Sequence, residues 1–165
     1  MSARARVLAA HGLEVTVPPG WDGSIRLAAG DHPSTDVEEV SALGTANPVL
    51  QVASFALPRV RGDFGGGAVE GMRPLDVFVA LVEFDPAAAD APLFDRRGLR
   101  RPLKEADFSR ATMHRPIPGH SGHQQFFHAQ GRAFSLYVAL GSHRLRRSQL
   151  PRVNAVVGSL SVGRR

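Results

Sequence analysis

The sequence contains no cysteine among its 165 residues. Disulfide bonds, thiolate metal sites, thiol nucleophiles and lipid-anchored cysteines are therefore excluded. No run of about 18 apolar residues occurs either, so we expect no transmembrane helix and no membrane partner. The apolar stretch at residues 7–10 is too short for the core of a signal peptide, so we expect residues 1–11 to form a flexible N-terminal arm. A cytoplasmic location is the expectation that follows.

Recognisable catalytic motifs are missing as well. Asp63-Phe64-Gly65 is a kinase-like tripeptide, but the lysine-bearing strand, phosphate loop and catalytic loop of a kinase do not accompany it. The Gly-x-Ser-x-Gly motif of serine hydrolases does not occur. Gly65, Gly66 and Gly67 could cradle a phosphate, yet no Lys-Ser/Thr pair follows them, so a flexible loop is the simpler interpretation.

Lysine is nearly absent, since Lys104 is the single one, and arginine supplies the remaining positive charge. Residues 1–94 hold six Arg against twelve Asp and Glu, a net charge of −6. Residues 95–165 hold fourteen Lys and Arg against three Asp and Glu, a net charge of +11. An anionic partner such as a nucleic acid is one interpretation of the basic half. We favour internal complementarity between the halves, because the arginines are scattered and the aromatic interleaving typical of single-strand-binding proteins is missing.

The last third of the chain carries the clearest structural pattern. Residues 124–128 and 132–140 are rich in aromatic and apolar side chains, and Ala129-Gln130-Gly131 between them is typical of a tight turn. This spacing predicts a hairpin in which Phe127 lies opposite Phe134. Because strand side chains alternate, one face of the second strand should be apolar and the other smaller and partly polar.

A helix should follow this hairpin, because apolar residues recur at helical spacing from Leu150 to Leu160. Pro151 is tolerated only near a helix start, and Ser148 and Ser142 are alternative N-caps. Gly158 should end the helix, and residues 160–162 could return to the sheet. Further strands are expected at residues 13–17, 24–28, 49–57 and 75–84, with a short helix around 89–97 and a glycine-rich loop at 59–73. Residues 75–84 are apolar on both faces, which indicates a central, doubly covered strand.

These elements predict one α/β (α+β) domain over residues 1–165, with a central twisted, mostly antiparallel sheet and flanking helices. The opening Leu-x-Val-x-Val-Pro-x-Gly-Trp, at residues 13–21, resembles the start of PsbP-like α/β/α sandwich proteins. Residues 124–162 are similar to the hairpin, helix and strand with which those domains end. The arginine-rich, lysine-poor texture also resembles small proteins of high-GC actinobacteria. The PsbP-like resemblance implies a sandwich fold and a mostly non-enzymatic, partner-binding role, and it transfers no functional residue.

Four histidines, His114, His120, His123 and His128, lie within 15 positions of one another. Three converging imidazoles can hold a catalytic metal ion with an open coordination position. On one strand, however, His123 and His128 would point to opposite faces, because they are five positions apart. A histidine-dependent metalloenzyme is therefore the alternative function, and our main expectation includes no cofactor.

The sequence thus predicts a non-catalytic binding or adaptor module that contacts another protein. The candidate contacts are the loop at residues 62–73, with Gly65, Gly66 and Gly67, and the basic stretch of Arg144, Arg146, Arg147 and Arg152. Nucleic-acid binding through the basic C-terminal half is a further alternative.

Overall fold

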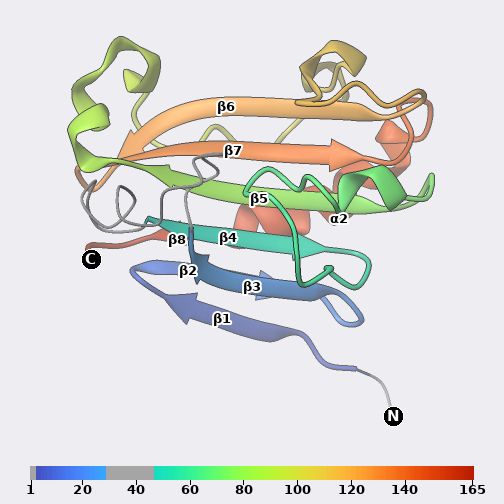
Figure 1. Ribbon diagram of the computed structural model, residues 1–165, viewed down its shortest axis with the longest axis horizontal. Coiled ribbons are helices and arrows are strands. Elements are labelled where there is room, and N and C mark those ends of the chain that lie inside the picture. The colour runs from blue at the N-terminus through green and yellow to red at the C-terminus, as the bar shows by residue number, and fades with distance from the viewer. Residues whose placement is uncertain (1–2, 29–46) are drawn as a thin grey trace.

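The computed structural model describes residues 3–28 and 47–165, and the regular structure of this part is mainly antiparallel sheet (Figure 1). The larger sheet has five strands in the order β3-β4-β5-β7-β6, and the smaller has three in the order β1-β2-β8. The larger sheet comprises β3 (Asp22–Leu27), β4 (Pro48–Ala53), β5 (Val77–Phe84), β6 (Ser121–Ala129) and β7 (Arg132–Leu140). The smaller comprises β1 (Arg6–Ala10), β2 (Leu13–Val17) and β8 (Ser161–Val162). With helix α2 (Arg146–Ser159), the described part is a mixed α/β structure with more sheet than helix.

The β6–β7 hairpin follows its predicted register. Phe127 pairs with Phe134, and their rings stack with centroids 5.5 Å apart. Gln130 and Gly131 both have positive φ, at 54° and 72°, as a two-residue hairpin turn requires. The prediction of a central strand at residues 75–84 is also confirmed, because β5 lies between β4 and β7 and all its residues except Phe84 are buried.

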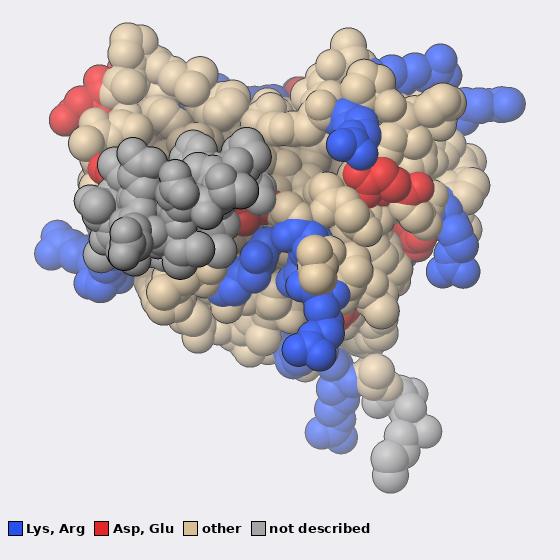
Figure 2. All heavy atoms as spheres, viewed as in Figure 1, with Lys and Arg blue, Asp and Glu red and all other residues tan. Residues whose placement is uncertain are grey.

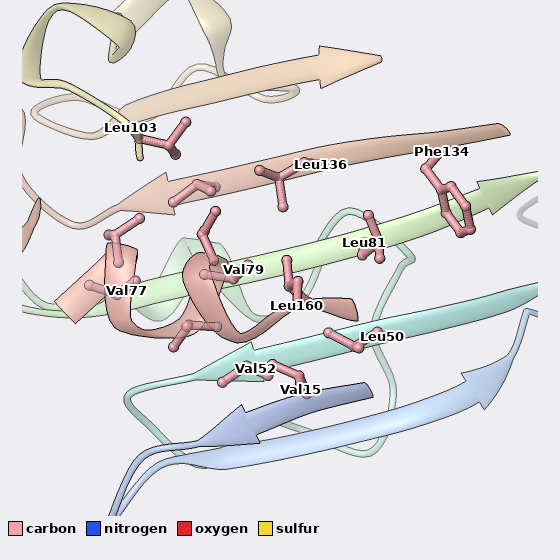
Figure 3. Packing of buried hydrophobic residues seen from close by; sticks show 14 of the residues in the cluster. Val15, Leu50, Val52, Val77, Val79, Leu81, Leu103, Phe134, Leu136 and Leu160 are labelled. Atoms are coloured by element: carbon pink, nitrogen blue, oxygen red, sulfur yellow. The ribbon is translucent and has the colours of Figure 1, made fainter. Parts of the chain in front are cut away.

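Two apolar layers cover the two faces of the larger sheet. On the helix face, the sheet packs against α2 and the inward side of β2, with Leu50, Val79 and Leu136 beside Val15 and Val153. Figure 3 shows part of this layer between the strands and the helix. On the opposite face, here called the loop face, the cover consists of the segments that carry η1 (Val69–Gly71) and η5 (Arg110–Thr112). Within the described ranges, no helix combines the length and apolarity needed to cross a bilayer.

The N-terminal arm expected over residues 1–11 is wrong for residues 6–10. These residues form β1, which pairs with β2 along its whole length. The tight turn between the strands depends on His11 and Gly12, which have φ of 54° and 74°. Leu8 packs against the core of the helix face. The apolar run at residues 7–10 is short and does not alternate with polar residues, so it does not predict a strand, and its pairing with β2 supplies the missing stabilisation.

Other elements differ from the predictions in placement. The strand near residues 24–28 pairs with β4 in the larger sheet. Residues 89–97 do not form one helix, because Pro92 lacks the N–H that would continue it and the chain forms η2 (Pro86–Asp90) and η3 (Pro92–Phe94) instead. Helix α2 begins at Arg146, with Leu145 at the N-cap position, so neither predicted serine is the N-cap. The remaining short helix of residues 3–28 and 47–165 is η4 (Glu105–Asp107).

A buried ion pair joins the two sheets. The guanidinium of Arg132 donates two hydrogen bonds to the Glu83 carboxylate, at 2.9 and 2.7 Å, and the Glu83 side chain has no exposed surface. The same guanidinium donates to the backbone oxygens of His11 and Gly163, at 2.9 and 3.0 Å. Arg165 approaches the carboxylate from outside, at 3.2 Å. One side chain of the larger sheet therefore holds both the β1–β2 turn and the segment after β8.

Replacing Arg132 with alanine should lower the free energy of unfolding by about 3 kcal/mol or more, because it leaves the buried Glu83 carboxylate without its main partner. Urea denaturation of both proteins measures the change. Arg73→Ala is the control, since Arg73 is 82% exposed and lies 3.5 Å from Asp76. That substitution should cost less than about 1 kcal/mol. Equal losses in the two variants would contradict the structural importance of the buried pair.

Candidate functional site

A glycine-rich turn at residues 62–67 lies on the loop face of the larger sheet. The buried side chain of Gln51 in β4 holds it there, because its Nε2 atom donates to the backbone oxygen of Gly62 at 2.9 Å. Gly65 has φ of +86° and lies against Phe78 of β5, where a Cβ atom would come within 2.8 Å of the ring. Both the backbone conformation and the packing therefore require glycine at this position.

Residues 113–118 lie beside this turn, although they are distant in sequence. The His114 imidazole stacks on the Phe64 ring, with centroids 4.2 Å apart, and meets the Tyr137 ring edge-on at 4.6 Å. The His114 backbone N–H donates to the Tyr137 hydroxyl at 3.3 Å, and that hydroxyl contacts the Met113 sulfur at 3.6 Å. Aromatic contacts therefore join the two loops to each other and to the buried strand β7.

An open cavity of about 260 Å³ lies between these two loops. At its edge, the Arg115 guanidinium lies 3.5 Å from the Glu70 carboxylate, whose other oxygen accepts a 2.8 Å hydrogen bond from the Gly67 N–H. The lining residues are Gly62, Phe64, Gly66, Val69, Glu70, His114, Arg115 and Tyr137. We call this recess the loop-face cavity, and it combines aromatic surface with a solvent-accessible ion pair.

Packing of the rings changes the pKa values of two side chains that line the cavity. His114 as a residue is exposed, but its ring lies against Phe64 and Tyr137, and this burial lowers the pKa of His114, with the Gln124 side chain acting in the opposite direction. Burial raises the pKa of Tyr137, against a smaller opposing effect of the His114 backbone. Both groups are therefore neutral at pH 7, and the cavity presents uncharged aromatic walls beside Glu70 and Arg115.

Two of the candidate metal ligands, His123 and His128, already form hydrogen bonds within the fold. The ring of His123 is buried on the helix face, with Nδ1 3.1 Å from the Asp107 backbone oxygen and Nε2 3.0 Å from Nε2 of Gln125. Since the carbonyl only accepts and the amide only donates, His123 is a neutral imidazole protonated at Nδ1. His128 lies on the other face, as its spacing predicts, and its Nδ1 atom is 2.6 Å from the Phe94 backbone oxygen.

The other candidate histidines do not form a metal site with His123 and His128. His120 is buried near Met72, and its Nδ1 atom has no hydrogen-bond partner among the described residues. Burial lowers the pKa of His120, and contact with the Met72 backbone opposes this shift. Across residues 3–28 and 47–165, no three His, Asp or Glu side chains are grouped closely enough to hold a metal ion. The structure therefore does not bring His114, His120, His123 and His128 together.

The four arginines of the basic stretch differ in exposure and in their contacts. Arg144 and Arg147 are exposed, whereas Arg146 forms an ion pair with Glu105 at 3.2 Å. Arg152 lies over the Trp21 ring, with its guanidinium carbon 5.1 Å from the ring centroid. Figure 2 views the loop face, with α2 behind the sheet, and its Lys and Arg side chains are spread over several places. Helix α2, which carries Arg146, Arg147 and Arg152, packs on the helix face, whereas the glycine turn lies on the loop face.

The sequence predicted one of the two loops that line the loop-face cavity. The predicted contact loop at residues 62–73 contains Gly62, Phe64, Gly66, Val69 and Glu70, and His114 was a metal candidate, but Arg115 and Tyr137 were not predicted. One signal was present in the strand pattern. Tyr137 is the single large side chain on the β7 face predicted to be small, so its neighbours leave space for loop residues to pack against it.

Comparison with known proteins finds no matching family model, no significantly similar curated protein and no significantly similar solved structure. An interpretation of function therefore depends on the geometry of the chain itself.

Two neighbouring glycines provide a matched test of the turn. Gly65→Ala should lower the free energy of unfolding by about 2–4 kcal/mol, through left-handed strain and a clash with Phe78. Gly66→Ala should change it by less than about 0.5 kcal/mol, because a Cβ atom there meets open space. Urea denaturation of the two variants measures both changes in the free energy of unfolding. If Gly65→Ala is as stable as the wild type, the placement of the turn against Phe78 is wrong.

Stability should also depend on His123 below neutral pH. Burial lowers the pKa of His123 in the folded state, with the backbone and charge of Asp107 opposing the shift. The unfolded chain therefore binds a proton first, and stability falls as the pH drops below about 6.5, the ordinary histidine value. In urea denaturation, the stability advantage of the wild type over His123→Gln should be largest at pH 7.5 and shrink at pH 5.5. A constant difference would contradict the assignment of a buried neutral imidazole.

Proposed function

We propose that this protein is a non-catalytic binding module that holds a segment of another protein at the loop-face cavity. The observation that carries this proposal is the preformed recess between two loops distant in sequence, joined by the stacked rings of Phe64 and His114. A recess fixed before binding loses little conformational entropy when a partner arrives.

The chemistry of the lining favours binding over catalysis. The lining residues include no serine, threonine, cysteine or lysine that could act as a nucleophile. His114 and Tyr137 are neutral, and the two charged side chains already pair with each other. Gly66 and Gly67 are exposed at the rim, so a partner's backbone could approach closely there.

Of the basic stretch, we retain Arg144 and Arg147 as candidate secondary contacts. Their side chains are exposed and form no hydrogen bond or ion pair with the described residues. Arg146 and Arg152 are less suitable, because releasing them for a partner would break contacts with Glu105 and Trp21.

The PsbP-like sandwich is also part of this proposal. Its support is the β1–β2 hairpin that precedes Trp21 and the closing order of β6, β7, α2 and β8. A cytoplasmic site of action remains a prediction from the sequence.

The matched pair Gly66→Trp and Gly158→Trp tests the proposal. Both glycines are exposed with open space at the Cβ position, but Gly66 lines the cavity whereas Gly158 lies in α2. In affinity purification with quantitative mass spectrometry, Gly66→Trp should lose a protein partner that the wild type and Gly158→Trp retain. Arg144→Glu/Arg147→Glu should weaken that capture to a smaller extent.

Other outcomes would overturn the proposal. Equal capture by Gly66→Trp and the wild type would exclude the cavity as the binding site. Stoichiometric metal in the eluate without a protein partner would favour the metalloenzyme, since a folded metal site retains its ion. Recovery of nucleic acid that falls steeply with salt would favour the basic half as the interface.

A further inference from the structure

Resting on the proposed function, we infer that the loop-face cavity accepts a positively charged side chain, arginine or lysine, from the partner protein. The charge would lie against the Glu70 carboxylate, and the alkyl stem would lie along the rings of Phe64 and His114. The inference depends on three observations: the state of Glu70, the nature of the walls and the size of the recess.

Glu70 is a positioned but weakly paired carboxylate. The Gly67 N–H donates to one of its oxygens at 2.8 Å, which orients the group on the glycine turn. The other oxygen faces Arg115 at 3.5 Å, and the Arg115 side chain is 75% exposed. An ion pair of this kind contributes roughly 0–1 kcal/mol, so an incoming cation could replace Arg115 at little energetic cost. The Glu70 side chain is itself 33% exposed, so a partner can reach it.

The walls favour a cation as well. The faces of aromatic rings carry negative electrostatic potential and attract ammonium and guanidinium groups. Phe64 is partly exposed and His114 is exposed, so both can meet an incoming side chain. Burial of the His114 ring keeps it neutral, so it does not repel a positive charge. Arginine and lysine stems also pack on apolar surface while their charged heads stay near water.

A negatively charged ligand fits this site poorly. The Gly67 N–H that would bind an anion already donates to Glu70, and the negative charge of the Glu70 carboxylate would repel an anionic ligand. Arg115 is the one cation among the lining residues, and it already faces Glu70. The volume of about 260 Å³ lies below the roughly 300–1,000 Å³ of typical small-molecule sites, which suits one side chain of a macromolecule better than a whole cofactor.

Nuclear magnetic resonance titration of the full-length protein with single-residue probes tests this inference. The basic probes are Nα-acetyl-arginine amide and Nα-acetyl-lysine amide, and the matched controls are Nα-acetyl-glutamate amide and Nα-acetyl-leucine amide. Each is added to about 50 mM, since a single side chain should bind with millimolar affinity. The basic probes should shift the amide signals of Gly66, Gly67, Glu70 and Arg115, and the controls should not.

Glu70→Gln preserves the size of the side chain and an oxygen for the Gly67 N–H, so it removes only the charge. It should weaken binding of the basic probes about fivefold, as expected for the loss of one accessible ion pair. Glu14→Gln, at an exposed position on β2, should leave binding unchanged. The inference is overturned if the controls shift the same signals equally, if no probe shifts them, or if Glu70→Gln binds like the wild type.

Failure here can be separated from failure of the proposed function. If Gly66→Trp loses the protein partner while Glu70→Gln retains it fully, the cavity binds protein but does not select a positive charge. If Gly66→Trp retains the partner, the binding module at this cavity is wrong, whatever the probes show.

Discussion

The buried ion pair between Glu83 and Arg132 is the interaction on which the arrangement of the sheets depends. A carboxylate without water is stable only when paired and hydrogen-bonded, so Arg132 is held at one position. From there it also binds the backbone of His11 and Gly163, which places the small sheet on the helix face. The loop face is left to irregular segments, and these segments form the cavity.

Some of the ion pairs join the acidic first half of the sequence to the basic second half. Acidic residues of the first half meet arginines of the second in the Glu83–Arg132 and Glu70–Arg115 pairs, whereas other pairs, such as Arg26–Asp63 and Arg146–Glu105, lie within one half. The first two pairs differ in burial and therefore in role. The buried pair is a structural constraint, whereas the accessible pair is weak enough to exchange partners. The acidic residue at the cavity is thus available for recognition without loss of the fold.

How much of the fold and of the cavity could be predicted depended on how far apart in the sequence the contacting residues lie. The β6–β7 hairpin and the central strand β5 follow from local alternation and turn chemistry, and both were predicted. Strand β1 was not, because its stability comes from pairing with β2 and from the Leu8 contact with the core. The loop at residues 62–73 was predicted as a contact, but its packing against residues 113–118 was not, because the stack of Phe64 on His114 joins loops distant in sequence and neither loop carries a periodic pattern. Local patterns could not show that the four candidate histidines would not be grouped at one metal site.

The central claim is that the loop-face cavity, and not the basic stretch near α2, is where a partner binds. Site-specific photo-cross-linking tests it most directly, with benzoylphenylalanine placed in turn at Gly66, at Arg144 and at Ala155, which is exposed on α2. We expect a strong cross-link to one protein from position 66, a weaker one from 144 and none from 155. Cross-linking from position 144 or 155 without any from 66 would contradict the account.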